Sequence, residues 1–395
     1  MGLAHSPRLI TNGLVFYYDI GNQQKSWKGA PTTNLAKTSS GVIDWSIANL
    51  NQAVSRSTLI TNEKYVISSS SLTGDAFRMY FNLSNLVDGQ TYTLSYKYKI
   101  LTGEYFRAND WNDQSITRNT VLLGNDVYYE TATGTRSTYN STYRFMDFSM
   151  SNNTQVEIYD LQLEQRSFAT PYVESATSNV RSNTQALLDL TGSKTIDLIN
   201  TTDSTFNSDS NALTLDGNNQ YIYANGGNFW NAWSPNGVNG NSSMSIEVVF
   251  NSTDTSGLII SRPWNGGGQY NYRMGAGSIV LHIGSSSTSI GYGNVCTGDT
   301  VHMVYWMNPT QYGVYKNGQT HISATNHGLS GSGGSNGTND FGTLFGSLYP
   351  YGEGWSGNTG YSIAGKYYQA KIYNRVLSAE EIRQNFNALR GRYGI

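Results

Sequence analysis

KIYNRVLSAEEIRQNFNALRGRYGI, residues 371–395, is the stretch that decides the fold class of this chain. It predicts a short strand that leads into a helix. Ser378 is placed to cap the helix, and Glu381, three residues later, completes a capping box. Leu377 and Ile382 have the spacing of a hydrophobic staple, which fixes the angle at which the chain enters the helix.

The predicted helix is amphipathic. Ile382, Phe386 and Leu389 recur along one face, and Gly391 is placed to end the helix. No other stretch of the 395 residues predicts a comparable helix. One small helix that closes a long run of strands favours an all-β domain with the helix packed on it.

Composition points to the same fold class. Gly (42) and Tyr (29) are abundant and charged residues make up only 13%, so turn and strand formers outnumber helix formers. A chain of 395 residues also exceeds what one hydrophobic core usually serves, so we expect at least two domains. The net charge of −2 and the lack of a Lys/Arg run argue against nucleic acid as a partner.

Cysteine usage and the N-terminus bear on where the protein works. The single cysteine, Cys296, excludes an intramolecular disulfide framework and a multi-cysteine metal site. The opening residues MGLAHSPRLITNG contain no apolar segment of a secretory signal, and no run is long enough to span a membrane. We expect the protein to be made in the cytoplasm, not to insert into a membrane, and to function in an exposed or extracellular setting.

Several segments have the pattern of strands. Thr91–Ile100 alternates strictly between apolar or Tyr side chains and Thr, Ser or Lys side chains, and Met244–Phe250 also alternates. Val156–Glu164 (VEIYDLQLE) and Gly13–Asp19 (GLVFYYD) predict two further strands. Asn317-Gly318 is the strongest short hairpin signal in the chain.

The two ends of the chain resemble one known family. Ser6–Tyr18 (SPRLITNGLVFYY), with Asp19 and Asn22, resembles the opening of a laminin-G-like domain of bacteriophage virion proteins. The C-terminal strand and helix resemble the end of the same concanavalin A-like jelly roll. In that family an Asp-Leu-Ser-Gly-type turn and a strand ending in Asp-Gly follow the opening closely. Here the matching segments, Asp189–Gly192 (DLTG) and Leu215–Gly217 (LDG), arrive only after a long intervening stretch.

The intervening stretch resembles the carbohydrate-binding jelly rolls of phage tail and fibre proteins, in its Asn34-Leu35 start and its VEIYDLQLEQRSFATPYV ending at residues 156–173. These resemblances imply a domain insertion. The predicted fold is all-β, with two β-sandwich (jelly-roll) domains, one inserted in the other, and a short C-terminal helix. The predicted parts are a polar docking arm at 1–11 that lies outside any core, a laminin-G-like sandwich at 12–33 and 185–395, a carbohydrate-binding jelly roll at 34–174, and a linker at 175–184.

The carboxylates do not form the pair that glycoside hydrolysis needs, two acids about 5–9.5 Å apart. Glu247 stands alone in an apolar strand and is expected to face outward from the sheet. Asp160 and Glu164 share a face of their strand, but four residues of regular strand separate them by roughly 13 Å, and Glu157 points the other way. The sequence therefore predicts no enzyme, although distant residues can still converge in space.

The histidines show no metal-ligand or nucleophile pattern. None has the HExxH spacing or a local Cys or Ser partner. We expect each to be a loop or strand residue without a special role; they are His5, His282, His302, His321 and His327.

Binding chemistry has more support. Sugar rings present apolar C–H faces that lie flat on aromatic side chains, while polar neighbours hold the hydroxyl groups. Three loops combine Trp and Tyr with Gly, Asn and Arg: Phe229–Trp233, Arg262–Arg273 and Tyr349–Trp355. The candidate glycan-binding residues are Trp264, Tyr270, Tyr272, Arg273, Tyr351 and Trp355, with Arg78, Tyr80 and Trp111 as equivalents in the inserted jelly roll. The alternative is that these residues pack internally or form subunit contacts.

One metal is implied by resemblance. Asp160 resembles the acidic residue that ligates a structural calcium in many carbohydrate-binding jelly rolls. Calcium takes six or more oxygen ligands, and a plain surface carboxylate is the alternative. We expect no other cofactor.

Together these observations favour a bacteriophage virion surface protein, a fibre, tail or head-decoration component that acts by non-covalent binding to host-surface glycans. A purely structural decoration protein that binds other virion proteins is the main alternative, and a glycan depolymerase is a weaker one. The expected partners are other virion proteins and host-surface polysaccharide. Display proteins of this kind are commonly symmetric, so a homo-oligomer is also expected.

Overall fold

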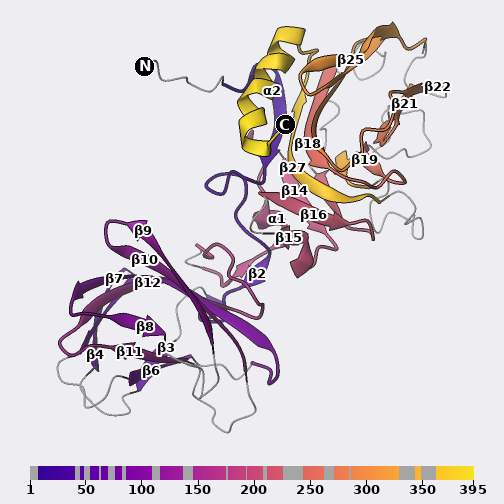
Figure 1. Ribbon diagram of the computed structural model, residues 1–395. Helices are drawn as coiled ribbons and strands as arrows, with labels where there is room; N and C mark the ends of the chain where they lie inside the picture. Colours follow the sequence, from indigo (N-terminus) through magenta and orange to yellow (C-terminus); the bar gives the residue numbers. More distant parts are fainter. Residues whose placement is uncertain are drawn as a thin grey trace, which may run out of the picture. The chain divides into compact units, whose positions relative to one another are not determined.

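The computed structural model describes residues 8–40, 45–48, 54–61, 64–69, 76–81, 86–108, 116–136, 146–174, 177–192, 194–207, 211–225, 243–261, 271–283, 286–328, 343–347 and 362–395. The chain divides into two compact units (Figure 1). The first unit is discontinuous and contains Met1–Gly29 and Asn183–Ile395, and the second contains Ala30–Ser182. The sequence placed the corresponding boundaries at 33/34 and 174/185.

The first unit is built from two sheets around one core. Its eight-stranded sheet runs β15 (Phe206–Asn207), β16 (Ala212–Asp216), β27 (Ala364–Tyr373), β18 (Met244–Asn251), β23 (Thr300–Met307), β24 (Gln311–Lys316) and β25 (Gln319–Asn326), with β1 (Leu14–Asp19) also paired to β27. The seven-stranded sheet runs β14 (Thr195–Ile199), β17 (Tyr221–Asn225), β26 (Thr343–Phe345), β19 (Leu258–Ser261), β20 (Asn271–Gly275), β21 (Ser278–Ile283) and β22 (Ser286–Gly291). Residues from both sheets share one buried apolar cluster, as a sandwich requires.

The first strand of this unit is completed by chain that returns far downstream. β1 pairs antiparallel with β27, with Tyr18 opposite Ala370. The DLTG turn secures the same strand, because Asp189 Oδ1 accepts a hydrogen bond from the Tyr17 amide at 2.9 Å and the Leu190 amide donates to the Tyr17 carbonyl at 2.7 Å. These contacts join segments that are more than 170 residues apart in the sequence.

Helix α2 (Ala379–Tyr393) lies against the outer face of the eight-stranded sheet (Figure 1). Its predicted capping box is confirmed: the Glu381 amide donates to Ser378 Oγ at 3.3 Å, and the Ser378 amide donates to Glu381 Oε2 at 2.9 Å. The helix does not stop at Gly391, as the sequence predicted, but at Gly394, which adopts a left-handed φ of 69°. The extra turn allows Tyr393 to pack against Tyr368.

Two further local features of this unit follow from sequence. The Asn317-Gly318 hairpin between β24 and β25 is confirmed, with φ of 51° and 74° at the two turn residues. The remaining helical segments described are each about one turn long, α1 (Asn183–Ala186) and the 3-10 helix η1 (Asp203–Thr205). No described helix is long and apolar enough to cross a membrane.

The predicted docking arm behaves differently where it is described. Leu9 and Ile10 are partly buried and pack on the apolar clusters beneath α2. The Ile10 amide donates to Asn385 Oδ1 at 2.8 Å. The expectation that residues 1–11 lie outside any core is therefore wrong for Leu9 and Ile10; residues 1–7 are outside the described part.

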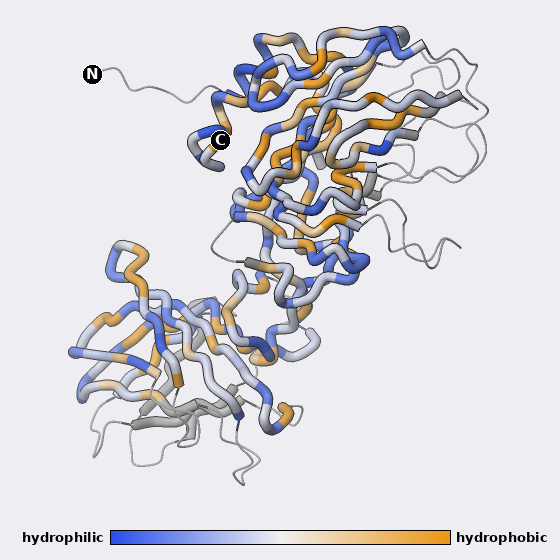
Figure 2. Tube along the Cα trace, turned by 45° about the vertical axis from the view of Figure 1, so that its right-hand side comes forward, coloured by the Kyte–Doolittle hydropathy of each residue, from blue (hydrophilic) through white to orange (hydrophobic). Residues whose placement is uncertain are grey.

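The second unit is also a sandwich. Its six-stranded sheet runs β4 (Val54–Thr61), β5 (Lys64–Ser69), β12 (Gln155–Glu164), β7 (Thr91–Thr102), β10 (Val127–Thr135) and β9 (Thr117–Gly124). Its four-stranded sheet runs β3 (Trp45–Ala48), β6 (Ala76–Phe81), β11 (Met146–Met150) and β8 (Phe106–Ala108), and β2 (Thr32–Thr33) pairs with β13 (Val180–Arg181). Alternating residues of the strands fill the core, and Figure 2 shows hydrophobic positions interspersed with hydrophilic ones in this unit. The predicted all-β fold class, with sandwich units and a C-terminal helix, is confirmed.

A buried charged cluster lies between the eight-stranded sheet and α2. Glu247 is on the sheet face that points away from the sandwich core, as expected, but α2 covers it completely. Its Oε1 is 2.6 Å from Lys371 Nζ and 3.1 Å from His302 Nε2, and its Oε2 accepts a hydrogen bond from Asn385 at 2.7 Å. The expectation of an ordinary role for His302 is therefore wrong, because its Nε2 lies beside a fully buried carboxylate.

Protonation of this cluster predicts an acid transition. Burial by itself raises the pKa of Glu247, but Lys371 and His302 more than offset it and lower the pKa from 4.5 to about 2. A carboxyl group with a lowered native pKa stabilises the fold fully above its unfolded pKa and loses that contribution as the pH falls. Glu247→Gln should cost about 3–5 kcal/mol near neutral pH, because it leaves Lys371 buried without a counter-charge.

Urea unfolding between neutral pH and pH 2 measures this effect. The wild-type protein should lose stability between pH 4.5 and about 2, and Glu247→Gln should show much less of this loss. Glu104→Gln, at an exposed position of the second unit, is the control and should keep the wild-type profile. An unchanged acid transition in Glu247→Gln would assign it to other carboxyl groups.

Candidate functional site

The outer face of the six-stranded sheet is shaped by a β-bulge in β12. Tyr159 is opposite Lys97 of β7, but Gln162 is opposite Ser95, so β12 contains one extra residue. Asp160 lies in this bulge with a φ of +54°. Bulges of this kind reset the alternation of a strand, because one residue has no partner on the neighbouring strand.

The bulge overturns one sequence expectation. Val156 and Ile158 point into the core before it, and Leu161 and Leu163 do so after it. Glu157, opposite Lys99, therefore lies on the same outer face as Asp160, which binds Lys97. The prediction that Glu157 points away from Asp160 assumed a regular strand and is wrong.

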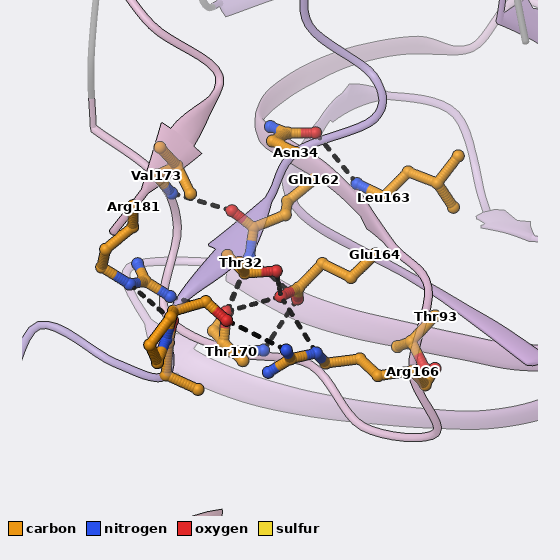
Figure 3. Close-up of polar contacts among 12 residues, drawn as sticks. Thr32, Asn34, Thr93, Gln162, Leu163, Glu164, Arg166, Thr170, Val173 and Arg181 are labelled. Carbon is orange, nitrogen blue, oxygen red and sulfur yellow. Dashed lines mark hydrogen bonds and ion pairs between the residues drawn. The ribbon is translucent and has the colours of Figure 1, made fainter. Parts of the chain in front are cut away.

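On one side of the bulge the outer face is closed by the chain itself (Figure 3). Glu164 is fully buried. Its Oε1 accepts hydrogen bonds from the Thr32 and Thr170 hydroxyls at 2.6 and 2.7 Å, and its Oε2 accepts from the Thr170 amide at 2.8 Å and from Gln162 Nε2 at 2.9 Å. A carboxylate with four donors is well compensated for its loss of water.

Arg181 completes this closed region (Figure 3). It donates to the Ala30 carbonyl at 2.8 Å, the Pro171 carbonyl at 2.8 Å and Thr170 Oγ1 at 2.7 Å. Burial lowers its pKa to about 10, although Glu164 acts in the opposite direction. The cluster joins the first residues of the unit to its last ones, so its role is to close the sandwich and not to bind a ligand.

The closing role predicts a large stability effect at Glu164. Glu164→Ala should destabilise the second unit by about 3–5 kcal/mol, because it leaves the buried donors of Thr32, Gln162 and Thr170 without their acceptor and removes the negative charge near Arg181. Glu157→Ala is the matched control, since its ion pair with Lys64 at 2.7 Å is partly exposed and should contribute no more than about 1 kcal/mol. Hydrogen exchange of peptides from residues 30–182 measures both, and equal protection in the two variants would contradict the closing role.

On the other side of the bulge the outer face is open and carries a continuous cross-strand row. Strand registers place five side chains in line across five strands, which we call the Tyr/Lys row: Val121 (β9), Tyr129 (β10), Lys97 (β7), Tyr159 (β12) and Lys64 (β5). Neighbouring strands are about 4.8 Å apart, so the row is about 19 Å long. Val121 is 45% exposed and the other four are partly exposed.

Charged and polar side chains flank this row. Lys99 and Glu157 face each other on one side of it, and Ser95 and Thr131 do so on the other. Lys97 Nζ is 2.7 Å from Asp160, and Lys64 Nζ lies 5.2 Å from the centre of the Tyr159 ring. The ion pairs hold the lysine side chains beside the two tyrosine rings. Ammonium groups, which donate hydrogen bonds, and carboxylates, which accept them, therefore both lie near the surface.

The two tyrosines remain neutral phenols over the physiological pH range. Burial raises the pKa of Tyr129, and burial also raises the pKa of Tyr159. Each therefore offers a flat ring and a hydroxyl group that can donate or accept a hydrogen bond. The row is suited to an elongated ligand that has both apolar faces and hydroxyl groups.

The structure places the predicted glycan-binding residues in different surroundings, and several of them lie outside the described residues. Tyr272 on β20 is 3% exposed and belongs to the core of the first unit, so it is not a surface platform, and this corrects the prediction. Arg273, also on β20, is partly buried. Trp264, Tyr270, Tyr351, Trp355 and Trp111 lie outside the described residues. Arg78 and Tyr80 are on β6, opposite Asp147 and Ser46 respectively.

The sequence did not single out the Tyr/Lys row. Tyr159 stands in an alternating stretch of Val156–Glu164, which was a usable signal for an outer face, whereas Val127–Thr135 around Tyr129 shows no such alternation. Their alignment depends on which residue of β7 faces each of them. Sequence does not fix this register, because a further strand and connecting segments separate β10 from β12 along the chain. The bulge is a second reason that the sequence could not predict the row. One extra residue in β12 changes the face on which Asp160 lies relative to a regular strand.

The surroundings of Asp160 favour an ion pair over the calcium site implied by resemblance. Lys97 is bound to its Oδ2 at 2.7 Å. The part of the chain that the structure describes contains no group of three or more His, Cys, Asp or Glu side chains that could hold a metal ion. The described contact of Asp160 is an ion pair, and no role is derived for calcium.

No protein-family model matches this chain, and no curated protein matches its sequence. Partial likenesses exist among solved structures. The binding domain of botulinum neurotoxin serotype G is 17% identical with a TM-score of 0.37 and matches 51% of this chain, which spans about half (48%) of that structure.

Two further likenesses are to enzymes. Trypanosoma rangeli sialidase in complex with sialic acid is 11% identical with a TM-score of 0.37 over 88% of this chain and 54% of its own. Domain 4 of the extracellular arabinanase AbnA from Geobacillus stearothermophilus, in complex with arabinotriose, is 11% identical with a TM-score of 0.31 over 44% of this chain and 75% of its own. At these scores no function transfers to this chain.

Proposed function

We propose that this protein is a non-enzymatic binding protein and that the Tyr/Lys row of its second unit holds an extended glycan. The supporting observation is the alignment of Tyr129, Lys97 and Tyr159 on neighbouring strands of an open sheet face. The ring faces stack on the apolar sides of sugar rings. The lysine ammonium groups, the Glu157 and Asp160 carboxylates and the Thr131 hydroxyl hydrogen-bond to sugar hydroxyls.

The geometry favours a linear ligand over a compact one. The row runs across the strands for about 19 Å at about 4.8 Å per position, and partly exposed groups repeat along it. A compact small molecule would need a concave pocket that buries most of its surface, whereas a flat face with repeated contacts suits a polymer of similar units. Binding would then depend on the summed contribution of several weak contacts.

The setting that we propose is the surface of a bacteriophage particle, in a fibre, tail or head-decoration component. Its support is the sequence resemblance at Ser6–Tyr18 and at the C-terminus, together with the physical link between two of its motifs. Asp189 of the DLTG turn binds the backbone of β1, which gives a reason for the two segments to occur together. The proposed partners are host-surface polysaccharide and other virion proteins.

The glycan proposal predicts a loss of binding on truncation of the row. Tyr159→Ala should weaken binding to immobilised host-surface polysaccharide about tenfold or more, as aromatic truncation at the centre of a contact surface does. The matched control is Tyr105→Ala, a partly buried tyrosine of the same unit outside the row, which should bind like the wild type. Surface plasmon resonance on a panel of host polysaccharides measures this difference.

Two other outcomes would replace the proposal. A wild-type protein that binds no polysaccharide on the panel but remains on washed particles would be a structural decoration protein. Release of new reducing ends from a polysaccharide during incubation would indicate a depolymerase instead.

A further inference from the structure

The edge strand β9 is exposed along its whole length. All eight residues of Thr117–Gly124 are exposed, and Val121, Leu122 and Leu123 keep 45%, 59% and 54% of their surface. Figure 2 shows a hydrophobic stretch near the tip of the β9–β10 hairpin. Exposed apolar side chains in one run on a monomer mark an interaction surface more often than scattered ones do.

The backbone of β9 is available for strand pairing. β9 is the terminal strand of the six-stranded sheet, and among the described strands it pairs only with β10. Half of its amide and carbonyl groups therefore point away from the sheet. Natural edge strands are commonly protected by Pro, by Lys or by a covering element, but Thr117–Gly124 contains neither Pro nor Lys.

The charges beside this edge are self-complementary. Arg118 is near the start of β9 and Asp126 lies in the turn just beyond its end, both exposed. The strand from Arg118 to Gly124 alone spans about 20 Å, so the two side chains do not pair within one chain. An antiparallel second copy, centred near Val121 and Leu122, brings Arg118 of each copy to Asp126 of the other, whereas a parallel copy brings like charges together.

We propose that β9 pairs antiparallel with β9 of a second copy of this chain. The two six-stranded sheets then form one continuous sheet about a two-fold axis perpendicular to it, and Leu122 and its neighbours become buried. The outer faces of both copies stay on the same side, so the two Tyr/Lys rows lie on one common surface. The pairing does not depend on glycan binding.

The experiment is sedimentation velocity on the full-length protein from about 1 to about 100 µM, since mass action moves a dimer equilibrium over such a range. The wild type should become dimeric as its concentration rises. Leu122→Lys should weaken the dimer about tenfold or more, because it puts two like charges at the centre of the interface. Val87→Lys, at a position 54% exposed in the same unit, is the control and should dimerise like the wild type.

A wild type that stays monomeric throughout, or a Leu122→Lys variant that dimerises normally, would overturn the proposal. Circular dichroism of both lysine variants checks that they are folded.

A charge cycle tests the antiparallel orientation. Arg118→Gln and Asp126→Asn should each weaken the dimer about fivefold, as the loss of two exposed ion pairs does. The double variant should be no weaker than either single one, because both changes remove the same pairs. Additive losses in the double variant would contradict the antiparallel arrangement. Because the readout is the dimer constant, it is separate from the polysaccharide experiment.

Discussion

The chain leaves its first unit after Gly29 and returns to it at Asn183. Each unit must therefore hold the segment at which the chain departs next to the segment at which it returns, and the other features of the fold depend on this constraint. In the first unit the departing and returning segments are side by side, because the Lys28 amide donates to the Ala186 carbonyl at 2.8 Å. In the second unit β2 pairs with β13, and Arg181 binds the Ala30 carbonyl at 2.8 Å. A sandwich with neighbouring termini can occupy a loop of another without disturbing its core.

The same closure determines which part of the sheet is left for binding. The segment after β12 folds back over the outer face and buries Glu164 and Gln162 there. The bulge at Asp160 marks the boundary, and the Tyr/Lys row lies beyond it. One face therefore combines a closed half that stabilises the unit with an open half that is available to a ligand, and the neighbouring edge strand β9 is available to a second copy.

Buried charge is used repeatedly, and each instance connects distant segments. Glu247 joins β18, β27 and α2, and Asp19 binds Arg392 through two contacts of 2.7 and 2.8 Å, so that β1 is held to the end of α2. Such pairs contribute little net stability compared with apolar packing, but the loss of one partner is costly. They act here as connections that are satisfied only when the remote segments meet.

The sequence by itself determined the local features. Ser378 and Glu381 predict the start of α2, and Asn317-Gly318 predicts its hairpin, because capping and turn geometry depend on residues within a few positions. Alternation along Thr91–Ile100 and Met244–Phe250 likewise predicts strands, in agreement with the all-β class that residues 371–395 indicate. Only the tertiary structure decided that Glu247 is covered, that Tyr272 lies in the core, and that Tyr129, Lys97 and Tyr159 form one row. Each of these depends on pairing between remote strands, and one bulged residue is enough to change the face on which a side chain lies.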